Sequence, residues 1–253
     1  MARLVILGSS NAIPDLEHEN THMVLVGEHN VVLVDCAGTP TVRLAQAGIA
    51  LDKISDLVLT HFHPDHVAGV PLLLMNMWLL GRRRPLSIHG LKHCLDRVQR
   101  LMDDYLWQTW PGFFGADFKL VAEEEGVLVV EAEDFRVLAS PVEHLVPTIG
   151  LRFENPSQGR AIVYSCDTAP CPAVMRLAQG ADVLIHEAAG ESPGHSSAEQ
   201  AGEIARQAKV GRLLLIHYPN AGPNGEQDLN KQAQGSFSGQ VELATDLMKI
   251  DLF

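Results

Sequence analysis

The sequence predicts a mixed α/β domain, because short apolar runs with strand character alternate with longer segments of helix character. The chain has 253 residues, of which 46% are hydrophobic, so one large core is within its reach. Neither an internal repeat nor a low-complexity tract divides it. We therefore expect a single domain over residues 1–253.

The predicted strands are apolar runs of four to six residues bounded by turn residues. In chain order they cover residues 3–7, 22–26, 30–35, 57–60, 86–89, 127–131, 135–140, 149–153, 161–165, 183–186, 212–217 and 247–252. The predicted helices cover residues 40–47, 67–80, 91–105, 172–179 and 198–208. The strands fall into two blocks with helices between them, which suggests two sheets.

The most informative segment reads Thr-His-Phe-His-Pro-Asp-His at positions 60–66 and directly follows an apolar run. Four possible metal ligands lie within six positions there: His61, His63, Asp65 and His66. An irregular loop that leaves a buried strand can turn all four toward one centre, which a helix could not do for residues i and i+2. The pattern indicates two metal ions; the alternative is a surface loop that holds three of the twelve histidines.

Three more candidate ligands lie at strand exits. His144 and Asp167 follow predicted strands, and His217 closes the apolar run 213–216. Taken alone, each has an ordinary explanation: an exposed loop histidine, a carboxylate that caps the next helix, and a hydrogen-bonded core histidine, respectively. Because all three occupy the same topological position as the first motif, we expect them to meet it in space.

Imidazole and carboxylate ligands without thiolates suit Zn²⁺ first, and Mn²⁺ or Fe²⁺ as well. Two such ions about 3.5–4 Å apart can bridge a water molecule and lower its pKa to roughly 7. Hydroxide is then available at neutral pH. The ligand set therefore predicts a hydrolase that uses two divalent metal ions.

The order His-x-His-x-Asp-His, His, Asp, His resembles the metallo-β-lactamase superfamily of dinuclear hydrolases over nearly the whole chain. The resemblance implies an α/β fold of the four-layer αββα sandwich type, with two sheets back to back and helices outside. It also implies a bridging role for Asp167, and a role for Asp65 in orienting or deprotonating the attacking water. The implied ligand sets are His61, His63 and His144 for one ion, and Asp65, His66 and His217 for the other.

A narrower resemblance links two segments, Ile-His-Glu-Ala at 185–188 and the segment that begins Gly-His-Ser-Ser-Ala-Glu-Gln at 194, to ribonuclease Z, which trims the 3′ ends of tRNA precursors. The departing 3′ oxygen needs a proton, and a histidine held by a carboxylate supplies one. His195 would be that acid and Glu187 its holder. The alternative is a capping box in which Ser196 and Glu199 begin the helix 198–208 while His195 is merely exposed.

Three departures from ribonuclease Z bear on the substrate. Only 22 positions separate His144 from Asp167, so the long arm that grips tRNA has no room. The chain continues after His217 with Tyr-Pro-Asn in place of the expected serine and arginine. The net charge is −12, and residues 82–84 form the only dense basic cluster, for which the alternative is a solvated helix end.

Two segments stay open at this stage. Residues 105–115 hold two tryptophans and two phenylalanines, and they either pack under a loop, line a pocket or form a dimer interface. Residues 220–240 are rich in Gly, Asn and Gln, and we expect a mobile loop that is either a lid or an inert surface feature. No apolar stretch reaches 18 residues, and neither a signal peptide nor a Cys-x-x-Cys pair is present, which favours a cytoplasmic enzyme with reduced thiols.

The sequence thus predicts a cytoplasmic, ribonuclease Z-like metal-dependent hydrolase. Its expected substrate is a small phosphodiester or an RNA 3′ end, without a membrane partner and with a homodimer as one possible assembly. A hydrolase of a small lactone, ester or sulfate ester is the first alternative, because the same hydroxide attacks carbon or sulfur. A metal-binding scaffold without turnover is the second.

Overall fold

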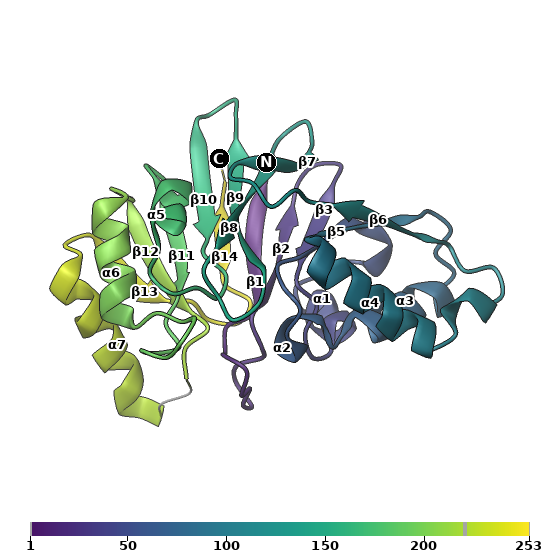
Figure 1. Ribbon diagram of the computed structural model, residues 1–253, viewed down its shortest axis with the longest axis horizontal. Helices are drawn as coiled ribbons and strands as arrows, with labels where there is room; N and C mark the ends of the chain where they lie inside the picture. Colours follow the sequence, from purple (N-terminus) through teal and green to yellow (C-terminus); the bar gives the residue numbers. More distant parts are fainter. Residues whose placement is uncertain (1, 220–221, 253) are drawn as a thin grey trace.

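The computed structural model describes residues 2–219 and 222–252, which form two seven-stranded sheets packed face to face (Figure 1). The first sheet has the order β14 (Lys249–Asp251), β1 (Arg3–Gly8), β2 (His22–Val26), β3 (Val31–Val34), β4 (Ile54–Leu59), β5 (Leu86–Gly90) and β6 (Ala116–Leu120). The second has the order β13 (Gln240–Leu243), β12 (Arg212–Ile216), β11 (Val183–Glu187), β10 (Arg160–Tyr164), β9 (Thr148–Asn155), β8 (Arg136–Val142) and β7 (Val127–Glu131).

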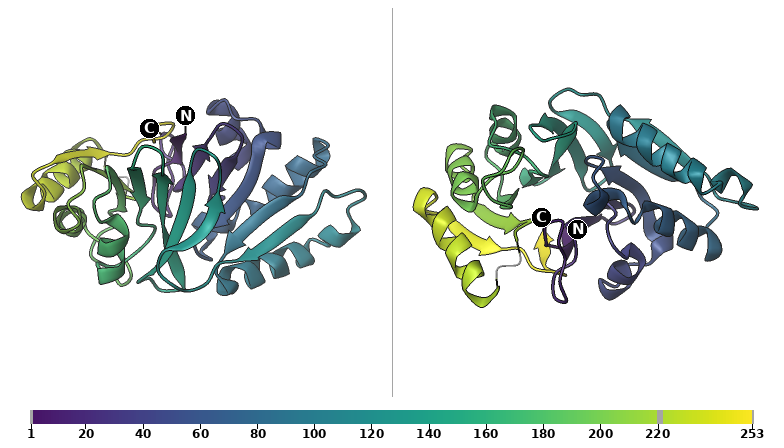
Figure 2. Two further views of the ribbon diagram at one scale, coloured as in Figure 1. Left: turned by 90° about the horizontal axis from the view of Figure 1, so that it is seen from above. Right: turned by 60° about the horizontal axis from the view of Figure 1, so that its bottom comes forward.

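Helices cover the outer face of each sheet (Figure 2). The first sheet carries α1 (Pro40–Gln46), α2 (Pro64–Val67), α3 (Val70–Leu79) and α4 (Lys92–Asp104), with the 3₁₀ turns η1 (Leu51–Lys53) and η2 (Trp107–Thr109). The second carries α5 (Pro172–Ala178), α6 (Ala198–Gln207) and α7 (Gly222–Ser236). The predicted four-layer αββα sandwich is confirmed.

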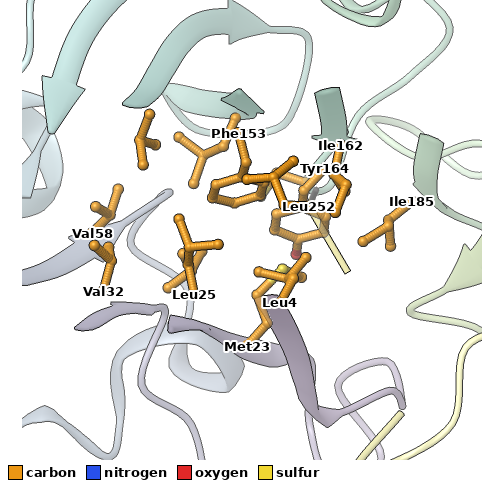
Figure 3. Packing of buried hydrophobic residues seen from close by; sticks show 14 of the residues in the cluster. Leu4, Met23, Leu25, Val32, Val58, Phe153, Ile162, Tyr164, Ile185 and Leu252 are labelled. Atoms are coloured by element: carbon orange, nitrogen blue, oxygen red, sulfur yellow. The ribbon is translucent and has the colours of Figure 1, made fainter. Parts of the chain in front are cut away.

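Three apolar layers hold the sandwich together. The central layer lies between the two sheets, and Leu25, Phe153 and Ile185 are among its fully buried side chains (Figure 3). In β3, Val32 and Val34 face this layer, whereas Val31 and Leu33 face the helices. Because both faces of β3 are buried, every residue of the strand must be apolar.

Parallel strands set the position of the functional side chains. In the first sheet β3, β4, β5 and β6 run parallel, and in the second β10, β11, β12 and β13 do. The carboxyl ends of parallel strands meet at one edge of a sheet, and loops at that edge carry binding residues. The segments that follow β4, β10 and β12 hold six of the seven predicted ligands, with Asp65 and His66 in α2, and His144 follows the antiparallel strand β8.

The predicted helix over residues 67–80 corresponds to α3, which begins at Val70; a short helix that was not predicted, α2, precedes it and ends at Val67, with Ala68 and Gly69 between the two. The Gly69 amide donates to the Cys36 carbonyl oxygen at 2.8 Å instead of continuing the first helix. A Cβ at Gly69 would lie 2.8 Å from the same oxygen, so the chain passes there only as glycine. Asp65 and His66 lie in the short helix before this break, at the edge where the other candidate ligands lie.

The expectation of a mobile loop over residues 220–240 is wrong in most of its length. Residues 222–236 form α7, β13 begins at Gln240, and residues 220–221 lie outside the described part of the chain. The side chains of Leu229, Ala233 and Phe237 recur every fourth position and pack against the outer layer of the second sheet. Strand β6 was also missed, because it is a largely exposed edge strand without apolar alternation.

The aromatic segment packs under its own loop. Trp78 and Trp110 stack at 5.1 Å between ring centroids, and Trp107 lies edge-on to Phe113 at 5.5 Å. Arg82 is not a solvated residue at a helix end: it is 4% exposed and donates to the Arg84 and Pro85 carbonyl oxygens. The basic cluster therefore stabilises the turn before β5.

The remaining features agree with the sequence. All four cysteines are free and buried. β9 and β10 are antiparallel neighbours joined by residues 156–159, which leaves no place for an inserted arm between them. In the described part of the chain, every helix is too short or too polar to cross a bilayer.

Candidate metal centre

The seven predicted ligands meet at one edge of the sandwich, which lies near α2 at the bottom of Figure 1. They form two groups that share Asp167, each with ligand atoms within 4.8 Å of one another. The first group is His61, His63, His144 and Asp167, and the second is Asp65, His66, His217 and Asp167.

In the first group, three imidazoles face one another. His63 Nδ1 lies 3.0 Å from His61 Nε2 and 3.1 Å from His144 Nε2. Asp167 Oδ2 lies 3.9 Å from both of these Nε2 atoms. Zn–N bonds of 2.0–2.1 Å in a tetrahedron place ligand atoms about 3.3 Å apart, so this spacing suits one common ion.

In the second group, Asp167 Oδ2 is again the shared atom. It lies 3.5 Å from His66 Nε2 and 3.3 Å from His217 Nε2. Asp65 Oδ2 lies 3.6 Å and 4.0 Å from the same two nitrogens. One carboxylate oxygen is thus common to both groups, so Asp167 would be the residue that contacts both ions if two were bound.

The ring nitrogens that face away from the two groups have partners of their own. His66 Nδ1 lies 2.8 Å from Asp35 Oδ2, and His144 Nδ1 lies 2.7 Å from the Gly194 carbonyl oxygen. His217 Nδ1 lies 3.2 Å from Thr21 Oγ1. Such partners fix the ring orientation and leave the other nitrogen for a metal.

Sequence reasoning missed these supporting residues. Asp35 directly follows β3, the same strand-exit position that marked Asp167, so that rule could have found it. It also accepts from the Thr60 hydroxyl and amide at 2.8 Å and therefore links two neighbouring strand ends. Thr21 carries no comparable signal, because it reaches His217 across the two sheets.

Two orphaned atoms test whether the residues fit metal ions. Among the described residues, His66 Nε2 and Asp167 Oδ1 are buried without a hydrogen-bond partner. A buried polar atom without a partner is costly, and coordination to a cation removes that cost. Both atoms belong to residues of the second ligand group, so the donor set fits bound metal.

Burial also prepares the imidazoles for coordination. It lowers the pKa of His61 well below its usual value and that of His217 to about 4, and it lowers the pKa values of His63 and His144. These rings therefore stay neutral, which is the form that binds metal. His66 differs: against the effect of burial, the Asp167 and Asp35 carboxylates raise its pKa well above the usual value.

Three strand exits at this edge adopt the left-handed conformation. Asp35, Cys166 and His217 have φ values of 58°, 56° and 54°, respectively. Residues other than glycine rarely adopt this region, and such strain concentrates at functional sites. The turn at Cys166 buries its thiol 3.5 Å from His61 Nδ1 and presents the next residue, Asp167, to the ligands.

His195 lies beside the metal-ligand groups and is held by Glu187. Its Nδ1 lies 2.9 Å from Glu187 Oε1, and its ring centroid is 4.9 Å from that of His144 and 6.0 Å from that of His217. The hydrogen bond to Glu187 raises the pKa of His195. Glu187 is itself fully buried and accepts the amides of Thr168 and Ser196, both at 3.1 Å.

The alternative capping box of Ser196 and Glu199 is wrong. The helix cap is Ser197, which accepts from the Gln200 amide, while the Gln200 side chain accepts from the Ser197 amide. Ser196 instead donates to the Thr168 carbonyl oxygen at 2.7 Å. A cap one residue later still anchors the loop that carries His195. Asp167 is also not a cap, since α5 begins after Cys171.

Comparison with known proteins agrees with this fold and ligand cluster. The family model described as the beta-lactamase superfamily domain matches residues 30–218. The fold, the ligand cluster and this match define a metal-dependent hydrolase, and the family implies divalent metal ions at the cluster.

Relatives refine the assignment. A ribonuclease Z from Mycobacterium sp. (strain KMS) is 30% identical to this chain, and the alignment covers 100% of this chain and 96% of the relative. A ribonuclease Z from Methanothermobacter thermautotrophicus is 28% identical, and the alignment covers 100% of this chain and 97% of that relative. Human tRNase Z, short form, superposes with a TM-score of 0.78 at 25% identity over 99% of each chain. The metallo-beta-lactamase fold protein YhfI from Bacillus subtilis superposes with a TM-score of 0.83 at 22% sequence identity, over 98% of each chain. The chain belongs to the beta-lactamase superfamily and, within it, to the ribonuclease Z-like branch.

Proposed function

We propose that this chain is a phosphodiesterase that hydrolyses an RNA 3′ end or a smaller phosphodiester. One observation carries the proposal: Asp167 Oδ2 faces both ligand groups, and the His195–Glu187 pair lies directly beside them. Names of relatives support it, since curated proteins that align over the whole chain are called ribonuclease Z.

The proposed metals are two Zn²⁺ ions, with Mn²⁺ or Fe²⁺ as alternatives that suit the same ligands. When bound, two such cations make hydroxide available at neutral pH and polarise the phosphate that is attacked. In the first group His61, His63 and His144 would hold one ion. In the second group Asp65, His66 and His217 would hold the other, with Asp167 between the two.

The chain's own residues would then orient the reactants. Asp65 is slightly exposed and lies near His66 and His217, so its free oxygen can accept a proton from the attacking water. His195 is 20% exposed at its side chain, with Nε2 as the ring nitrogen that Glu187 leaves unused. We assign His195 the role of general acid toward the departing 3′ oxygen, and Glu187 that of its holder.

The substrate in this proposal is smaller than tRNA or is gripped in another way. The turn between β9 and β10 leaves no inserted arm, and the net charge of −12 opposes a large polyanion. Buried free thiols agree with the reducing cytoplasm, which is the compartment that we propose.

The test is hydrolysis of bis(p-nitrophenyl) phosphate by protein loaded with zinc and, separately, with manganese. We expect metal-dependent turnover that disappears in Asp167→Ala, because that change removes the shared ligand. A short RNA with a 3′ extension then tests the natural linkage. Two bound ions without turnover on either substrate would contradict the proposal and turn the search toward lactones, esters and sulfate esters.

A further inference from the structure

A cavity lies at the opposite end of the sandwich from the candidate metal centre. It has a volume of about 480 Å³ and is lined by the first residues of β10, β11 and β12 and by β14. The proposed ligands follow the other ends of these parallel strands. Five residues at about 3.3 Å each separate the two ends, so the cavity lies roughly 15–20 Å from the metal cluster. One of the strands that line it, β14, ends toward the top of the molecule in Figure 1.

The floor of the cavity is apolar because it is the end of the central core. Ile162, Val183 and Ile250 face the space between the sheets and belong to the central apolar layer, with Val183 9% exposed. The cavity thus opens where the two sheets separate. A volume of this size is within the range of about 300–1,000 Å³ that small-molecule sites occupy.

The rim of the cavity is cationic in a protein that carries a net charge of −12. Arg160, Arg212 and Lys249 line it. Arg160 is neutralised by Asp182, which also accepts the Ala161 amide at 2.8 Å. Arg212 and Lys249 remain, against Asp251, which is exposed at the edge strand, so three basic and two acidic residues leave the lining with one net positive charge.

Arg212 gives the strongest indication that the cavity binds a ligand. Its Nε is buried and has no hydrogen-bond partner among the described residues. Neither Arg212 nor Lys249 makes an ion pair with a described carboxylate. A buried guanidinium N–H without a hydrogen-bond acceptor costs free energy. An oxyanion offers two acceptor oxygens, which match the two parallel N–H groups of a guanidinium. Lys249 adds the second charge that a dianion requires.

We propose that this cavity binds a small phosphate monoester whose apolar or aromatic body lies on Ile162, Val183 and Ile250 and whose phosphate meets Arg212 and Lys249. The site is separate from the metal cluster and does not depend on the proposed phosphodiesterase activity. A nucleoside monophosphate has the required size and charge.

The test is titration calorimetry of AMP into zinc-loaded full-length protein, with adenosine as the uncharged arm. We expect AMP to bind and adenosine to bind at least about tenfold more weakly, since adenosine loses the charge-assisted hydrogen bonds. Arg212→Gln should weaken AMP at least about tenfold, and Lys249→Gln, at an exposed position, about threefold. Arg100→Gln removes an equal charge on α4 and should leave AMP binding unchanged.

Three results would overturn the proposal. The first is the absence of AMP binding at millimolar concentration. The second is AMP binding that Arg212→Gln and Lys249→Gln leave unchanged, which would place the nucleotide elsewhere, for example at the metal cluster. The third is equal binding of AMP and adenosine. Circular dichroism checks the fold of each variant, and the exposed Lys249 keeps the test valid if Arg212→Gln does not fold.

Discussion

Replacement of His195 by alanine separates the general acid from the metal chemistry. His195 is a member of neither ligand group, so His195→Ala should leave both ions bound. Its bond to Glu187 of 2.9 Å orients the ring and stabilises the protonated form, which is the state that a general acid needs. The change should therefore affect only a leaving group that requires a proton.

The expected magnitude follows from that geometry. General acid catalysis by a positioned side chain contributes about 10²–10⁴-fold, and a histidine fixed by a buried carboxylate belongs near the middle of this range. We expect kcat on an RNA phosphodiester to fall about 10³-fold in His195→Ala, which is about 4 kcal/mol of transition-state stabilisation. Bis(p-nitrophenyl) phosphate should lose less than about threefold, because its leaving group departs as a stable anion.

The assay measures kcat and KM on both substrates for the wild type, His195→Ala and His29→Ala, with the metal content of each protein. His29 is a matched control, since its side chain is 67% exposed and makes a single long contact with Glu133. Equal losses on the two substrates would refute the acid role. So would a loss of bound metal in His195→Ala, because the residue would then support the ligands.

Three further predictions concern metal binding and stability. Removal of the metal ions by a chelator should lower the melting temperature by about 8–16 °C for each ion lost, because an ion present at about 1,000 times its Kd adds about 4 kcal/mol and each kcal/mol corresponds to about 2–4 °C; an unchanged melting temperature in calorimetry would contradict tight binding. Asp35→Asn should weaken metal affinity about 10–100-fold in a competition titration, since it removes the carboxylate 2.8 Å from His66 Nδ1. Ser197→Ala should cost about 1 kcal/mol in urea unfolding through loss of the helix cap, and an unchanged midpoint would show that the capping box contributes nothing.

The sequence predicted most strands and the full candidate ligand set because both depend on local patterns. A buried strand must be largely apolar: β3 is entirely so, and β12 is apolar after its first residue, Arg212. A ligand must be a side chain with a lone pair at the end of such a strand, as Asp167 and His217 are. These rules need no knowledge of the partner segments.

The errors arose where a distant segment decides the local structure. α7 contains Gly222, Gly225 and Gly235, which weaken a helix by about 1 kcal/mol each, so its composition favoured a loop. The helix packs instead against α6, where a Cβ on Gly202 would lie 2.4 Å from the Ala233 carbonyl oxygen. Packing this close is a tertiary effect that composition does not reveal.

The same distinction explains why the chemistry is better defined than the substrate. The candidate ligands lie at or just after strand ends that belong to the shared fold, whereas substrate size is set by the segments that surround them. Here our proposal of a substrate smaller than tRNA rests on the short turn between β9 and β10 and on the net charge of −12. If catalytic groups and substrate grip are separable in this way, full-length precursor tRNA and its isolated 3′ end should be cleaved with similar kcat/KM. A large advantage for the full-length RNA would reveal a grip elsewhere on this surface.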